Sequence, residues 1–180
     1  MVKFEFNKKN TFCISLYSKP IRWEKMERRI KEAGIESVTR WKASVGGTED
    51  IKENFEDYLN DGQKGCAQSH INIWRHIKEN KEIEYALILE DDACFDKEWK
   101  KKLDQFNEDI ENEEKKENWE LILLNASEPI EKKNKWVQVE EQYLTGGYII
   151  SQKGVKAILE MFDKKYASRD WMTSRLEMRW

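Results

Sequence analysis

The amino-acid sequence predicts an α/β protein with a mostly parallel central sheet and flanking helices. Strand-like apolar runs alternate with amphipathic helical segments along the chain. The run at 85–89 shows no alternation of apolar and polar positions, which is typical of a strand buried on both faces. The chain has 180 residues, 39% of them apolar, and no Gly/Ser/Pro-rich linker, so we expect a single domain over residues 1–180.

Composition excludes several classes of protein. A net charge of −3 with interspersed basic and acidic residues gives no reason to expect a nucleic-acid partner. The three cysteines lie far apart and indicate neither a disulfide framework nor a zinc site. Cys13 and Cys94 lie in or beside apolar runs, so we expect them to be buried thiols. No signal peptide or membrane span is apparent, which predicts a cytoplasmic protein and leaves peripheral membrane contact open.

The N-terminal segment reads as a strand followed by a helix. Residues 11–16 form the predicted strand, Ser18 is a candidate cap, and Pro20 suits the first turn of a helix that Gly34 would end. Arg22 lies in that first turn. It is either a solvated helix arginine or a group that grips a phosphate or a base.

The next segment predicts a second strand and a buried helix. Residues 36–40 are a candidate short strand, 44–48 a turn, and 49–64 a loop with some helix. The helix would open at Gly65 and bury His70 among apolar residues. A histidine on such a face is more often a core residue than a catalyst. His76 points elsewhere on that helix, so we expect no histidine-rich metal centre.

The C-terminal half again contains predicted strands and amphipathic helices. Residues 97–118 predict an exposed amphipathic helix, 119–125 a buried strand and 136–139 a half-exposed strand. Two glycines at 146 and 147 precede a strand at 148–150, and Ser151 caps a helix bearing Val155 and Ile158. The aromatic, cationic tail at 169–180 is either a helix that covers the site or simply an end.

Three consecutive carboxylates end the strand at 85–89: Glu90, Asp91 and Asp92. Ligands bind outside the carboxyl ends of strands in such sheets. Adjacent like charges need solvent, cationic side chains or a bound cation, and oxygen ligands suit Mg²⁺ or Mn²⁺ better than zinc. An acidic loop that merely follows a strand is the alternative.

Four segments together resemble a known family. They are Ile14-Ser15-Leu16 followed by Arg22, Gly65-Cys66 with Ser69-His70, Leu89 to Ala93 (Leu-Glu-Asp-Asp-Ala), and the glycine turn at 145–151. In this order the chain resembles glycosyltransferase family 25, which holds lipooligosaccharide and collagen galactosyltransferases. The resemblance implies a GT-A type nucleotide-diphospho-sugar transferase fold, Rossmann-like, and inverting transfer from a nucleotide sugar, often UDP-galactose. Lys19-Pro20-Ile21 departs from the family's acidic residue before the arginine, which leaves the sugar and the acceptor open.

The resemblance also implies roles for residues. Asp92 would bind Mn²⁺ or Mg²⁺ directly, Asp91 would reach the ribose or the ion, and Glu90 would be more structural. Asp170 is the candidate catalytic base, with a surface aspartate as the equal alternative, and Trp171 would stack on a sugar. The residues expected to bind the UDP-sugar are Ser15, Leu16, Arg22, Ser69, His70, Glu90, Asp91, Gly146, Gly147 and Tyr148.

Two other functions fit the same pattern. A nucleotide-sugar or glycan-binding module of the same fold would keep the acidic motif and lack turnover. Another Mg²⁺-dependent phosphoryl enzyme would use the same strand end, although the chain lacks the Gly-x-x-x-x-Gly-Lys loop of nucleotide triphosphatases.

Overall fold

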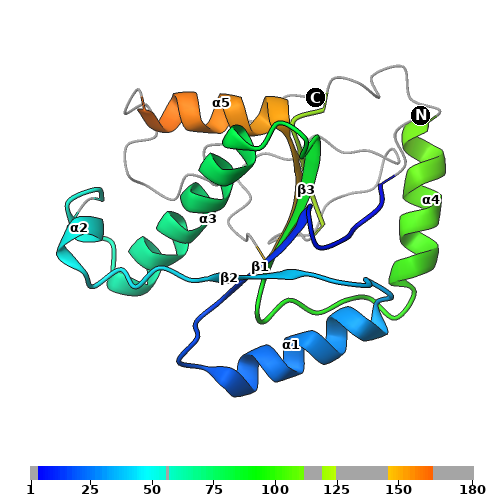
Figure 1. The fold of residues 1–180 in the computed structure, drawn as a ribbon, viewed down its shortest axis with the longest axis horizontal. Coiled ribbons are helices and arrows are strands. Elements are labelled where there is room, and N and C mark those ends of the chain that lie inside the picture. Colours follow the sequence, from blue (N-terminus) through cyan, green and yellow to red (C-terminus); the bar gives the residue numbers. More distant parts are fainter. Residues whose placement is uncertain (1–3, 56, 112–118, 125–145, 164–180) are drawn as a thin grey trace.

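A computed structural model of residues 1–180 describes residues 4–55, 57–111, 119–124 and 146–163. Its five-stranded sheet has the order β2-β1-β3-β5-β4 (Figure 1). The strands are β1 (Thr11–Ser15), β2 (Thr39–Lys42), β3 (Tyr85–Glu90), β4 (Leu121–Leu123) and β5 (Gly147–Ser151). The predicted strand at 136–139 and the tail at 169–180 lie outside the described residues.

Four of the five strands run in one direction, as expected of a mostly parallel sheet, and β5 is reversed, which makes the sheet mixed. β1 pairs in parallel with β2 and β3, whereas β5 runs antiparallel to both β3 and β4. A strand buried on both faces reads as a continuous apolar run whichever way its neighbours run, so the sequence of β3 could not reveal the direction of β5. The consequence is that β5 begins where β3 ends, with Gly147 opposite Leu89.

Helices cover both faces of the sheet, as predicted. They are α1 (Pro20–Glu32), α2 (Glu49–Lys52), α3 (Asp61–Glu79), α4 (Trp99–Glu111) and α5 (Gln152–Asp163). Figure 1 shows α1 and α4 on one side of the sheet and α3 and α5 on the other. Each side has its own apolar cluster: Ile88 packs with Trp74 and Ile158, and Leu87 packs with Met26 and Ile110. Successive residues of β3 therefore enter different clusters, which explains its unbroken apolar run.

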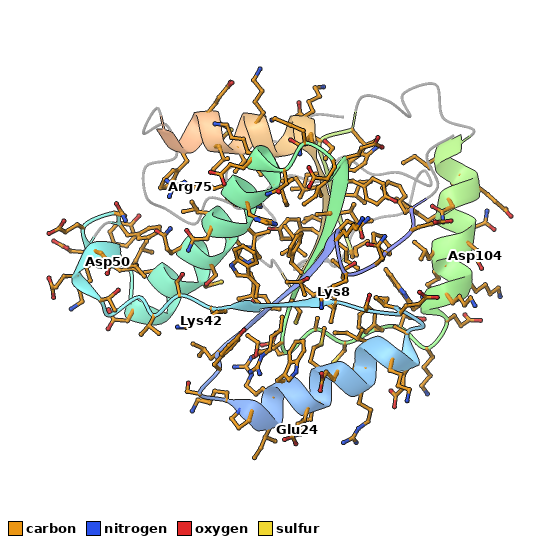
Figure 2. The ribbon with its side chains drawn as sticks, viewed as in Figure 1. Lys8, Glu24, Lys42, Asp50, Arg75 and Asp104 are labelled. Atoms are coloured by element: carbon orange, nitrogen blue, oxygen red, sulfur yellow. The ribbon has the colours of Figure 1, made fainter. Side chains whose placement is uncertain are left out.

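Charged side chains cover the outside of the helices. Figure 2 shows Glu24 of α1, Arg75 of α3 and Asp104 of α4 pointing away from the sheet, and all three are exposed. The high charge of the chain is thus a solvated surface around a two-sided core, as the interspersed charges indicated.

Local signals explain several helix ends. Gly34 follows α1 with φ +74, a left-handed conformation that glycine adopts without strain, and the Ser151 hydroxyl accepts a bond from Gly154 N at 3.1 Å to cap α5. Ser18 does not cap α1, because Lys19 occupies the cap and makes no side-chain bond there. α3 starts four residues before Gly65, since Asn60 and Gln63 form a reciprocal capping box.

The three cysteines differ in burial. Cys13 is buried, as expected, and burial raises the pKa of its thiol far above the usual range. Cys94 is exposed, which corrects the expectation that it is buried: it follows the turn after β3, where the chain has left the core.

Candidate active site

The carboxyl ends of β1 and β3 and the first residue of β5 meet at one edge of the sheet. Glu90 N donates to Gly146 O at 3.1 Å, and Gly147 lies opposite Leu89. Ser15 ends β1 beside them, and its carbonyl accepts from Ala43 N at 3.0 Å. The edge therefore brings together the predicted residues Ser15, Leu16, Glu90, Asp91, Gly146 and Gly147.

One guanidinium contacts both aspartates that follow β3 and offsets one of their two negative charges. Arg22 Nη2 lies 2.5 Å from Asp91 Oδ1 and 3.2 Å from Asp92 Oδ2. The Asp91 side chain is 7% exposed, whereas that of Asp92 is 68% exposed. Both aspartates reach the same group because the chain turns after β3, and Arg29 Nη1 holds this turn by donating to the carbonyls of Asp92 (3.3 Å) and Ala93 (3.0 Å).

Glu90 faces the other side of the sheet. It follows Ile88 in the alternation of β3, and its Oε1 lies 3.6 Å from His70 Nε2 and 4.0 Å from Cys66 Sγ, both on α3. The three carboxylates thus divide into two groups: Asp91 and Asp92 against α1, and Glu90 against α3.

A buried hydrogen-bond chain supports His70. Tyr148 of β5 lies with its hydroxyl 2.7 Å from His70 Nδ1, and Trp74 Nε1 donates to the same hydroxyl at 3.0 Å. Burial, and secondarily the nearby Glu90, raises the pKa of Tyr148 well above its usual range, so the hydroxyl keeps its hydrogen at neutral pH. His70 is consequently a core histidine on one side and a neighbour of the acidic cluster on the other.

Ser69 holds the loop after β2 against α3. It is fully buried; its hydroxyl donates to Gly65 O at 2.6 Å and accepts from Ser44 N at 2.8 Å. A Cβ on Gly65 would lie 2.6 Å from Ser44 O, so the loop and the helix approach closely only because residue 65 is glycine. The structure thus gives Ser69 a supporting contact, and its contact with a donor stays a prediction.

Arg40 is a site residue that sequence reasoning missed. Its Nη2 donates to Ser15 Oγ and to Leu16 O, both at 3.3 Å, and its guanidinium lies 4.4 Å and 4.8 Å from the ring centroids of Tyr17 and Trp23. Tyr17 is 55% exposed and so presents an aromatic face at the end of β1. The sequence does not distinguish Arg40 from a surface arginine, because the rings that it contacts, Tyr17 and Trp23, lie far from it along the chain.

The donor set at this edge fits a hard divalent cation. Mg²⁺ is usually held by one or two carboxylates together with substrate phosphates, and Asp91 and Asp92 supply such a pair. Across the described parts of the chain, the one group of three side chains whose ligand atoms all lie within 4.8 Å is Cys66, His70 and Glu90. Asp170 and Trp171 lie outside the described residues, so the role of Asp170 as the base stays a prediction.

Among the described residues, no helix is long and apolar enough to cross a membrane.

Comparison with known proteins identifies relatives along most of the chain. The model of the family described as "Glycosyltransferase family 25 (LPS biosynthesis protein)" matches residues 8–173. Procollagen galactosyltransferase 1-A of Xenopus laevis is 28% identical over 170 residues, covering 82% of this chain and 27% of the relative. A glycosyltransferase 25 family member of Drosophila melanogaster is 32% identical over 170 residues, with the same coverage. The "Inactive glycosyltransferase 25 family member 3" of Homo sapiens is 27% identical over 151 residues, covering 76% of this chain and 25% of the relative. The chain thus spans about a quarter of the length of these curated relatives.

Proposed function

The chain belongs to glycosyltransferase family 25, and on that premise we propose that it transfers a hexose, with galactose favoured, from a UDP-sugar to a hydroxyl of a glycan or protein. The observation that carries the proposal is the pair Asp91 and Asp92 beside Arg22 at the carboxyl edge of the sheet. The strand order, with one reversed strand, is compatible with a GT-A type domain.

The diphosphate of the donor would lie at this edge. A Mn²⁺ or Mg²⁺ ion would stabilise the leaving UDP as a Lewis acid. Both aspartates contact Arg22, and we propose Asp92 as the metal ligand because its side chain is exposed, whereas that of Asp91 is buried. Arg22 is half exposed and would add a cationic contact for a phosphate.

The nucleotide base would lie near Tyr17. Its exposed ring is backed by Arg40, which is itself held by Ser15 and Leu16. A planar base stacks well on such a surface, and the stiff backing lowers the entropy that binding would cost.

Inversion requires a base that deprotonates the acceptor hydroxyl from the face opposite the leaving group. Asp170 stays the proposed base. A cytoplasmic location with peripheral membrane contact stays a prediction.

Release of UDP from UDP-galactose tests the activity. With Mn²⁺ and a panel of sugar and peptide acceptors, we expect turnover by the natural chain and its loss in Asp92→Asn. Asp104→Asn is the matched control, since Asp104 is exposed on α4 far from β3 (Figure 2). Equal turnover in both variants would contradict the role of Asp92.

The relative named inactive motivates a second candidate. A binding module of the same fold would be stabilised against heat by UDP-galactose with Mn²⁺ and yet release no UDP with any acceptor. Failure to bind any nucleotide sugar would reject both candidates.

A further inference from the structure

His70 lies between a possible metal cluster and a hydrogen-bond chain. Its Nε2 is buried and makes no hydrogen bond in the part of the chain that the structure describes, while Cys66 and Glu90 approach it with potential ligand atoms. Its other nitrogen, Nδ1, contacts the Tyr148 hydroxyl. The same ring nitrogen, Nε2, could therefore be a metal ligand or a proton donor, and the tautomer decides which.

The Tyr148 hydroxyl determines the tautomer. Indole Nε1 can only donate, so the bond from Trp74 uses the hydroxyl oxygen as an acceptor. The hydroxyl hydrogen then points to Nδ1 of His70, which lies 2.7 Å from the hydroxyl oxygen and accepts the bond. Were Nδ1 to carry the proton instead, this hydroxyl would accept twice and leave its own hydrogen buried without a partner, which is costly. Neutral His70 consequently carries its proton on Nε2.

We propose that Trp74 and Tyr148 fix His70 as the Nε2–H tautomer, and that His70 thereby positions the Glu90 carboxylate at the sheet edge to accept a hydroxyl of the sugar nucleotide. The second half rests on the proposed function. An Nε2 that bears hydrogen has no lone pair for a metal, so Cys66, His70 and Glu90 form a hydrogen-bonding group rather than a metal centre.

The distances suit a positioning role. The 3.6 Å between Nε2 and Oε1 of Glu90 exceeds a formed hydrogen bond, and such contacts often tighten when a ligand binds. The Glu90 side chain is 27% exposed and His70 only 3%, so a ligand reaches the carboxylate and not the imidazole. His70 therefore acts on the ligand through Glu90.

Nitrogen-15 NMR of the histidine rings tests the tautomer directly. The chain has two histidines, so His76→Gln identifies the His70 signals. We expect the Nε2–H pattern in the natural chain and a mixture of tautomers in Tyr148→Phe. Tyr85→Phe is the control, because that tyrosine bonds to the Glu5 backbone at the opposite end of β3. An Nδ1–H pattern in the natural chain, or no change in Tyr148→Phe, would overturn the inference.

A titration with Co²⁺ tests the metal alternative. A Co²⁺–thiolate absorption band that disappears in Cys66→Ser but persists in Cys94→Ser would overturn the proposal. We expect no such band.

Equilibrium binding of UDP-galactose tests the role of His70 toward Glu90. We expect His70→Ala to raise Kd about tenfold to a hundredfold, which is the loss of one hydrogen bond to a charged group. His70→Gln, whose amide can donate from nearly the same place, should recover most of the affinity, and His76→Gln should match the natural chain. Equal Kd values for His70→Ala and His70→Gln would reject positioning. If the natural chain binds no UDP-sugar, both the proposed function and the role of Glu90 toward the sugar nucleotide are rejected. The NMR result still decides the tautomer of His70.

Discussion

Replacement of Arg22 by glutamine leaves the Asp91 carboxylate buried without its cation. Removing one partner of a fully buried ion pair costs about 3–5 kcal/mol, whereas an exposed pair contributes about 0–1 kcal/mol. Asp91 is 7% exposed and Arg22 is 47% exposed, so water screens only one side of this contact. We therefore expect Arg22→Gln to lower the free energy of unfolding by about 2 kcal/mol.

Urea unfolding followed by tryptophan fluorescence measures this change. Lys101→Gln is the control: its pair with Glu98 spans 3.4 Å, but both side chains are largely exposed, so we expect no measurable shift. The double variant Arg22→Gln/Asp91→Asn should recover part of the loss, because it buries no unpaired charge. If Arg22→Gln is no more destabilising than Lys101→Gln, or if the double variant recovers nothing, the account of this pair is wrong.

Three further predictions concern packing, pH and thiol reactivity. Gly65→Ala should lower the free energy of unfolding, measured with urea, by about 1–2 kcal/mol more than Gly62→Ala does. The methyl group at position 65 would lie 2.6 Å from the loop backbone, whereas the one at position 62 would lie 3.2 Å from a side chain. The Lys102 ammonium, 2.7 Å away, lowers the pKa of Asp96 in the folded chain; this stabilisation is present at neutral pH and is lost as pH falls through the lowered pKa, so the urea midpoint of Lys102→Gln should fall less on acidification. Cys13 should resist iodoacetamide at pH 8 until the chain unfolds, while the other two cysteines are labelled in the native state, as peptide mass mapping would reveal.

The parts of the fold that sequence predicted are those with local causes. Gly34 ends α1 through its own backbone conformation, and Ser151 caps α5 through its own hydroxyl. The direction of β5 has no local cause, since apolar residues bury themselves equally well in either orientation. The early start of α3 has a local signal, Asn60 with Gln63, but polar residues without an apolar stripe are also typical of a loop.

The site follows the same division. A strand that ends in acids predicts where Asp91 and Asp92 lie, and a helix first turn predicts that Arg22 lies near them. The partner of His70 is a tyrosine 78 positions away on an antiparallel strand, and no pattern within α3 could indicate it. Arg40 was missed for the same reason, because its surroundings exist only once β1, β2 and α1 have packed.

Calorimetric binding of UDP in the presence and absence of Mn²⁺ tests the central claim most directly. We predict that UDP binds with Mn²⁺, that EDTA abolishes the binding, and that Asp92→Asn weakens it at least about tenfold, as expected when a metal ligand or a charged contact worth about 1.4 kcal/mol or more is lost. Asp104→Asn should bind as the natural chain does. UDP binding that is indifferent to EDTA and to Asp92→Asn would contradict a cation held by this acidic edge.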